Sequence, residues 1–435
     1  MAVNEYSRLS RFVFRYLFPM VGAFTAYCSM YAFRKPFAAG TFEGEMLLGI
    51  DYKILLISLQ AMGYLLSKFI GIKVVSEMPP GKRAASILLL IGISWISLLL
   101  FAIVSVPYNV VFLFFNGLPL GMIWGLVFSY LEGRRNTELL GAGMSASFII
   151  SSGLVKSIGK YMVDGWQISE YWMPFLIGLM FVPLLLTGIW MLERTPPPDE
   201  ADIGHRSGRM QMDKQSRLAL FSSFSFGIVL VVGIYIALTI FRDIRDNFAV
   251  EIWAFLGQTD VASLLFWSEV PIALFVFTII ALMMYIRDNR VAFYSNLGII
   301  LLGGVILVFG TLVFSVALIG PVFWMIIVGF AMYLAYISYH TMLFERWFAH
   351  FRCTGNLGFF MYLADSFGYL GSLSVLLIKN FGGNSTNWLD VLIALSYIVG
   401  GATLILGGIA YLYFLDKEKK TEMGTLSIST AQKTF

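Results

Sequence analysis

Residues 27–37 read Tyr-Cys-Ser-Met-Tyr-Ala-Phe-Arg-Lys-Pro-Phe and close the first long apolar segment of the chain. The segment ends in two adjacent cations, Arg34 and Lys35. A cation at membrane depth is costly, so it usually pairs with an acid or faces a polar cavity. The alternative is that both side chains reach the membrane surface and contact nothing else. A second cluster, Phe241-Arg242-Asp243-Ile244-Arg245-Asp246, ends the seventh apolar segment and favours the cavity.

The composition is that of a membrane protein. The chain has 435 residues, of which 58% are hydrophobic and 13% charged, and its mean hydropathy is +0.80. A soluble protein of this length cannot bury so much apolar surface, so we expect an all-α polytopic membrane protein. The net charge of +4 is spread over short loops and does not indicate nucleic-acid binding. The two cysteines and three histidines suggest neither a disulfide framework nor a metal site, and no cofactor is predicted.

Twelve apolar segments are long enough to cross a bilayer as helices, which takes about 17 to 25 residues each. The expected spans are 14–36, 52–74, 84–104, 109–131, 140–162, 171–192, 218–242, 262–286, 291–316, 321–343, 354–379 and 388–415. The sequence therefore predicts an N-terminal six-helix half (1–193), a cytoplasmic linker (194–217), a C-terminal six-helix half (218–416) and a cytoplasmic tail (417–435).

Basic residues set the orientation, because loops rich in Lys and Arg stay in the cytoplasm. Arg8 precedes the first span, Lys82 and Arg83 follow the second, Arg287 follows the eighth and Lys417 follows the twelfth. All of these positions fall on one side when twelve spans alternate. Both termini are therefore predicted to be cytoplasmic, in a monomeric protein of the inner or plasma membrane that contacts the lipid bilayer.

The two halves read as a parallel repeat. The first and seventh spans both end in Phe-Arg, at Phe33-Arg34 and Phe241-Arg242. Two six-helix halves related by an axis along the membrane normal form the major facilitator fold, in which substrate binds near the midplane between the halves. Arg34 and Arg242 would then face each other, and two guanidinium forks suit a phosphate group. The alternative is that Arg242 pairs with Asp246, one turn along the same helix.

Four further charges lie within the expected spans: Lys68, Lys156, Glu269 and Asp365. In this architecture the fifth span packs near the eighth, and the second near the eleventh. Lys156 and Glu269 both fall in the outer part of their spans, so a contact between them would close the outer side. The alternative is that Lys156 extends to the surface while Glu269 bonds within its own half. A Lys68–Asp365 pair is a weaker expectation, because the estimated depths of the two residues differ.

Aromatic residues within the spans are candidates for lining a polar cavity with hydroxyl or indole donors. They are Tyr27, Tyr31, Tyr64, Trp124, Tyr333, Tyr336 and Tyr369. Aromatic residues at this density are more often packing or interfacial residues. His340 is a candidate proton carrier, and a packing role is its alternative.

Several motifs resemble one transporter family. They are Tyr31-Ala32-Phe33-Arg34-Lys35-Pro36-Phe37-Ala38, Gly63-Tyr64-Leu65-Leu66-Ser67-Lys68-Phe69, Gly121-Met122-Ile123-Trp124 and Phe367-Gly368-Tyr369-Leu370-Gly371. Together with Arg242, they resemble the organophosphate:phosphate antiporters of the major facilitator superfamily, which include bacterial glycerol-3-phosphate and hexose-phosphate transporters. The motifs come from both halves and cover about a quarter of the chain.

The resemblance implies that Arg34 and Arg242 bind the phosphoryl group of the substrate. It also implies that Lys35, Lys68, Asp246 and Glu269 surround the site, with an uncertainty of one residue for the two acids. The chain departs from the family in its fifth span, where residues 147–153 place Ser151 or a neighbour in the position of a family histidine. Asp365 and Lys156 are likewise not expected from the family.

We therefore expect a secondary active transporter of a small organic anion, phosphorylated according to the resemblance, with inorganic phosphate as a candidate exchange partner. The alternative function is a membrane sensor or receptor that binds an organophosphate without moving it. An enzyme is not expected, because the spans contain no nucleophile–base pair, metal cluster or phosphate-binding glycine loop.

Overall fold

The computed structural model describes residues 13–131, 137–196, 214–283, 285–351, 357–381 and 387–432. The N-terminal half, up to residue 196, contains η1 (Val13–Leu17), α2 (Phe18–Ala32), η2 (Pro36–Ala39), β1 (Met46–Leu47), β2 (Ile50–Asp51), α3 (Tyr52–Ser76), η3 (Pro80–Lys82), α4 (Arg83–Ile103), η4 (Tyr108–Val110), α5 (Val111–Leu120), α6 (Ile123–Phe128), α7 (Thr137–Asp164) and α8 (Met173–Glu193). The C-terminal half, from residue 214, contains α10 (Lys214–Asn247), α11 (Ala249–Phe255), α12 (Val261–Trp267), α13 (Glu269–Met283), α14 (Asn289–Ser315), α15 (Pro321–Ser338), η5 (Tyr339–Leu343), α16 (Phe344–His350), α17 (Leu357–Phe381) and α18 (Trp388–Gln432).

Within the described ranges, each expected membrane span overlaps a helix or consecutive helical segments. Within the described ranges, nine helical stretches are long and apolar enough to cross a membrane by length and composition. The other expected spans, 14–36, 140–162 and 354–379, fall on α2, α7 and α17. The predicted linker lies largely outside the described residues.

Helix α18 runs past the end of the twelfth expected span and continues to Gln432, into the predicted tail. Two ion pairs support this extension at its start. Lys420 pairs with Asp416 one turn earlier at 2.6 Å, and Glu418 accepts from Arg290 Nε at 2.8 Å. Charge pairs at the one-turn spacing stabilise a helix exposed to water.

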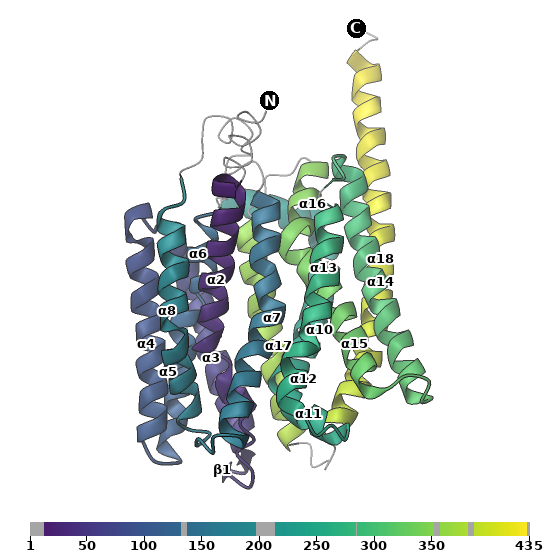
Figure 1. Ribbon diagram of the computed structural model, residues 1–435. Helices are drawn as coiled ribbons and strands as arrows, with labels where there is room; N and C mark the ends of the chain where they lie inside the picture. Colours follow the sequence, from purple (N-terminus) through teal and green to yellow (C-terminus); the bar gives the residue numbers. More distant parts are fainter. Residues whose placement is uncertain are drawn as a thin grey trace, which may run out of the picture.

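Each half packs mainly against itself. In the N-terminal half, α2 packs on α7 and α8, and α3 packs on α5; in the C-terminal half, α10 packs on α17 and α18, and α14 packs on α15 and α18. In Figure 1 the purple and blue helices of the first half lie beside the green and yellow helices of the second. The halves meet where α7 packs on α12 and α13 and where α17 packs on α3.

The two ends of the bundle differ. Strands β1 and β2 pair as a short antiparallel hairpin at one end, which we call the hairpin end (Figure 1). Helix α2 begins at the opposite end, and α18 projects beyond that same end. The arrangement agrees with an even number of passes through the membrane.

Helix α2 ends inside the protein. Its last residue is Ala32, and the chain from Phe33 to Gly40 continues as buried turns. Arg34 is only 8% exposed and Lys35 only 6%. The alternative in which both cations reach the membrane surface is therefore wrong. Both side chains instead enter the space between the halves.

A direct backbone contact joins α3 to α5 in the N-terminal half. A Cβ atom added to Gly63 would lie 2.2 Å from the carbonyl oxygen of Phe114, and one added to Gly117 would lie 2.2 Å from that of Gln60. Only glycine allows this approach. The Gln60 side chain then donates from Nε2 to the Arg34 carbonyl oxygen at 2.8 Å. The turn that carries Arg34 is thus fixed to the α3–α5 pair.

We predict that Gly63→Ala destabilises the protein by about 1 to 3 kcal/mol, because the added methyl group overpacks this contact. Thermal unfolding of the purified protein in detergent measures the effect. Gly92→Ala is the matched control, since a Cβ atom there meets nothing within 4 Å. Equal unfolding midpoints for the two variants would contradict the importance of the α3–α5 contact.

Candidate functional site

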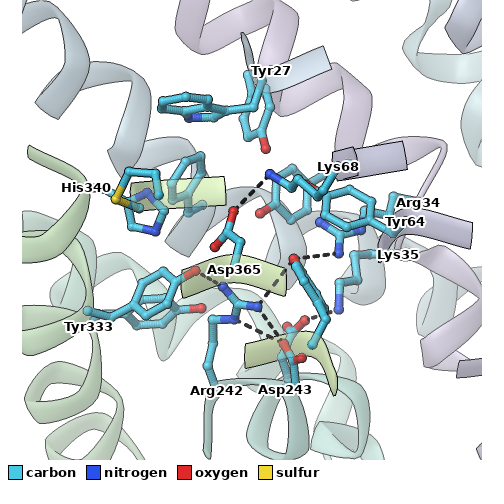
Figure 2. Close-up of a pocket in the computed structure, with 17 residues that line it drawn as sticks. Tyr27, Arg34, Lys35, Tyr64, Lys68, Arg242, Asp243, Tyr333, His340 and Asp365 are labelled. Atoms are coloured by element: carbon cyan, nitrogen blue, oxygen red, sulfur yellow. Dashed lines mark hydrogen bonds and ion pairs between the residues drawn. The ribbon is translucent and has the colours of Figure 1, made fainter. Parts of the chain in front are cut away.

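One cavity lies between the halves and is lined by aromatic and charged side chains (Figure 2). The eight residues predicted to bind substrate all line it: Tyr31, Arg34, Lys35, Tyr64, Lys68, Trp124, Arg242 and Tyr369. Asp246 and Asp365 line it as well, whereas Lys156 and Glu269 are not part of its wall. The cavity therefore brings together residues that are separated by up to several hundred positions in the sequence.

The two predicted arginines meet at one tyrosine hydroxyl. Tyr369 Oη accepts from Arg34 Nη2 at 3.2 Å and from Arg242 Nη2 at 3.5 Å. The Arg34 guanidinium also lies over the Tyr64 ring at 3.9 Å, and that of Arg242 over the Tyr336 ring at 4.6 Å. Aromatic faces attract cations without neutralising them. The arginines are thus held close together by uncharged partners on α17, α3 and α15.

The arginines differ in their acidic partners. Arg242 donates to Asp243 Oδ1 from Nη2 at 2.7 Å and from Nε at 3.1 Å. The expected alternative partner, Asp246, binds other residues instead. Arg34 has no carboxylate within ion-pair distance in the described part of the chain, and its buried Nε has no hydrogen-bond partner there. Arg34 is therefore the more available cation for a ligand.

A second network closes the hairpin side of the cavity. The Asp246 carboxylate lies 2.6 Å from Lys35 Nζ and 2.6 Å from Lys156 Nζ. Lys35 also donates to Asn247 Oδ1 at 2.7 Å. Nearer the hairpin, Lys53 on α3 pairs with Glu251 on α11. These contacts join the N-terminal half to the C-terminal half at several buried points.

The predicted ion pair between Lys156 and Glu269 is wrong, because each residue pairs with a different partner. Glu269 instead accepts from Arg245 Nη1 at 2.8 Å, within the C-terminal half. Arg245 and Asp246 are adjacent on α10, so they point in different directions around the helix. Arg245 faces α13, while Asp246 faces α7 and forms an ion pair with Lys156. A contact between Lys156 and the C-terminal half exists, but its acid is Asp246.

The weaker expectation, a Lys68–Asp365 pair, is present at 2.9 Å. Asp365 also accepts a hydrogen bond from the Tyr235 hydroxyl, which lies 3.0 Å from His340 Nε2. His340 sits among Tyr336, Phe148 and Trp124, so it combines packing with a polar contact. This cluster lies on the side of the arginines away from the hairpin end, and it joins α3 to α17.

Where the organophosphate antiporters that the sequence resembles have a histidine, this chain has serines. Ser152 donates to Asp246, while the buried Ser151 hydroxyl lies near the Cys28 thiol. The sequence places Ser151 or a neighbour at the histidine position. The neighbour, Ser152, is the residue that joins the charge network.

Some cavity residues are missed by reasoning from the sequence. Asp243, Phe148 and Met361 line the cavity, and Tyr235 supports Asp365 from behind it. The end of the apolar segment suggests an outer loop for Asp243; its position directly after Arg242 is the signal that could have found it. Within the described ranges, no group of three His, Cys, Asp or Glu residues is arranged to hold a metal ion.

A family model described as a family of unknown function (DUF5690) matches residues 36–417, which is well over half of the chain. The chain belongs to the DUF5690 family. No curated protein matches it in sequence.

Solved transporters have the same fold as this DUF5690 member. A crystal structure of a point mutant of the nucleoside transporter NupG aligns with a TM-score of 0.59 and 16% identity, covering 91% of this chain and 98% of that one. A D-xylose-proton symporter gives 0.57 and 14%, covering 91% and 96%. The human organic anion transporter MFSD10 (TETRAN) gives 0.54 and 13%, covering 91% and 98%. The chain is thus an all-α, multi-pass membrane protein with the major facilitator fold.

We predict that Asp246→Asn is more damaging than Lys156→Met. Removing one partner of a buried pair costs about 3 to 5 kcal/mol, because the other charge is left without compensation. Asp246→Asn leaves both Lys35 and Lys156 without a carboxylate, whereas Lys156→Met leaves Asp246 paired with Lys35. Thermal unfolding in detergent should rank the variants in this order.

Lys160→Met is the control for this comparison. Lys160 lies one turn further along α7 and pairs with the half-exposed Asp164 at 3.0 Å. Because Asp164 stays half-exposed to solvent when the pair is lost, the pair contributes little to stability, and this variant should unfold close to wild type. A larger loss for Lys156→Met than for Asp246→Asn would show that Asp246 is not the shared partner.

Proposed function

We propose that this protein is a secondary active transporter of a small phosphorylated organic anion. Its two halves, 1–193 and 218–416, would alternate between opening to either side around the central cavity, with 194–217 as the linker and 417–435 as the tail. By the distribution of Lys and Arg, both termini would lie in the cytoplasm and the protein in the inner or plasma membrane, acting as a monomer. A reporter fused after Phe435 tests that orientation.

The observation that carries the proposal is a surplus of positive charge around the cavity. Among the described residues, the cavity wall and the ion-pair partners that contact it directly contain five Lys or Arg side chains and three carboxylates, which leaves a formal surplus of two. The residues are Arg34, Lys35, Lys68, Lys156 and Arg242, against Asp243, Asp246 and Asp365. Buried charge without compensation is costly. A dianion would neutralise this surplus, and a phosphoryl group is a common biological dianion.

The positions of the arginines support a tetrahedral oxyanion in particular. Both guanidinium groups reach the Tyr369 hydroxyl, so they lie close enough together for one ligand beside that hydroxyl to contact both. Each guanidinium can donate two parallel hydrogen bonds to such a group. The uncharged aromatic partners hold the forks in place before the ligand arrives, which reduces the entropy lost on binding.

The same surplus favours exchange over one-way transport. An empty carrier would have to rearrange its halves around two uncompensated charges at membrane depth, whereas a carrier loaded with a dianion would be neutral. The loaded form should therefore reorient faster. Inorganic phosphate, which carries two charges as monohydrogen phosphate, is a suitable exchange partner for an organic phosphate.

Counterflow in proteoliposomes tests this function. Vesicles containing the full chain and loaded with inorganic phosphate should take up labelled phosphate, and a set of labelled sugar and glycerol phosphates should identify the organic substrate. Protein-free vesicles are the background. Binding of these compounds without any flux would indicate a sensor, and neither binding nor flux would refute a phosphoryl substrate.

We predict that Arg34→Lys and Arg242→Lys each weaken phosphate binding by about tenfold to over a hundredfold. Lysine retains the charge but loses the fork, and a hydrogen bond to a charged group contributes about 1.5 to 3 kcal/mol. The double variant should be less than additive, because both residues contact one ligand. Calorimetry on the purified protein measures the affinities.

Arg290→Lys is the matched control, because this arginine is largely exposed and pairs with Glu418. Wild-type affinity in both cavity variants would show that the arginines do not coordinate the anion.

A further inference from the structure

Asp243 places a carboxylate directly in a cavity that is otherwise suited to an anion. It lines the cavity beside Arg242 and is only 8% exposed (Figure 2). Its Oδ1 atom accepts both hydrogen bonds from Arg242, at 2.7 and 3.1 Å. A negative group so near the arginines weakens the attraction for any anion, so its presence needs a reason.

The second oxygen of this carboxylate, Oδ2, provides a reason for the presence of Asp243. Oδ2 has no hydrogen-bond partner among the residues that the structure describes, although Asp243 belongs to the cavity wall. An ionised carboxylate can only accept hydrogen bonds. An oxygen of a fully ionised ligand at this place would be repelled, whereas an O–H group would donate to Oδ2.

We infer that Asp243 is a specificity residue, which admits oxyanions that carry a hydrogen-bond donor and rejects those that are fully ionised. The inference rests on the proposed function, since it concerns the anion that the two arginines bind. Monohydrogen phosphate satisfies both requirements, because it has two negative charges for the surplus and one P–OH group for Asp243. A phosphate monoester dianion has no P–OH group, so in a sugar or glycerol phosphate a carbon-bound hydroxyl would be the donor to Asp243. Sulfate has the same charge and shape but no donor.

A purely structural role for Asp243 would give a different order of anion affinities. If the carboxylate served only to orient Arg242, phosphate and sulfate would bind with similar affinity. A buried acceptor strongly disfavours a fully ionised ligand such as sulfate, because binding removes water from the acceptor and supplies no hydrogen-bond donor in its place. Selection by Asp243 should therefore give at least a tenfold difference in affinity between the two anions.

The wild-type protein provides the first test. The purified full chain in detergent is titrated with phosphate, arsenate, sulfate and selenate, at a pH where phosphate and arsenate are mainly dianions that retain one O–H group. We expect phosphate and arsenate to bind at least tenfold more tightly than sulfate and selenate. Equal affinity for all four would overturn the role of Asp243 while leaving the anion site intact.

Asp243→Asn provides the second test. Its amide oxygen should face the two Arg242 donors, as Oδ1 does, so its NH₂ group should face the cavity in place of Oδ2. The acceptor thereby becomes a donor. We expect sulfate affinity to rise and the ratio of phosphate to sulfate affinity to fall at least tenfold. Asp390→Asn is the control, because Asp390 is an exposed residue in the first turn of α18.

The outcomes separate the two proposals. If none of the four anions binds wild-type protein, the proposed phosphoryl site fails and this inference fails with it. If the anions are discriminated but Asp243→Asn discriminates equally well, another residue is the specificity determinant. Should Asp243→Asn fail to fold, the order of the four anions on wild-type protein still tests the inference. Discrimination supports it, because the other two cavity aspartates, Asp246 and Asp365, are paired with lysines, whereas Asp243 Oδ2 has no partner among the described residues. Equal affinity for the four anions overturns it.

Discussion

The carboxylate of Asp246 is shared by two lysines, and the rest of the site depends on that arrangement. Lys35 follows α2, Lys156 comes from α7 and Asp246 from the end of α10, so one acid connects three elements of both halves. All three side chains are largely buried, and removing one partner of a buried pair leaves a charge without compensation. The contact therefore constrains how α2, α7 and α10 approach one another on the hairpin side of the cavity.

A second charged contact, between Lys68 and Asp365, joins the halves on the other side of the arginines. The cavity thus lies between two levels of ion pairs that connect the same two halves (Figure 2). At both levels the lysine belongs to the N-terminal half and the aspartate to the C-terminal half. In the proposed transport cycle, rearrangement of the halves would separate such pairs, and the proposed anion would compensate the lysines that are released.

The sequence was sufficient for the fold because long apolar segments and the distribution of Lys and Arg depend on the bilayer itself. It also indicated that Arg34 and Arg242 share a cavity, because the halves repeat.

The sequence was insufficient to predict the partner of Lys156, since the rotation of α10 about its axis decides whether Arg245 or Asp246 faces α7. Asp243 was missed for a related reason: neighbours on a helix normally diverge, yet the long Arg242 side chain folds back onto it. The likeness to organophosphate antiporters stays a prediction.

The glycine contact between α3 and α5 has a mechanical consequence for the proposed anion site. Backbones that touch directly cannot slide past one another without a steric clash, so the α3–α5 pair should move as a rigid unit. Gln60 ties the carbonyl group of Arg34 to this unit, whereas Arg242 belongs to α10 in the other half. The separation of the two guanidinium groups therefore measures the angle between the halves. Any rotation that opens the cavity also changes the distance between the two guanidinium groups. The affinity for the proposed anion would therefore depend on the conformation of the protein through this distance alone.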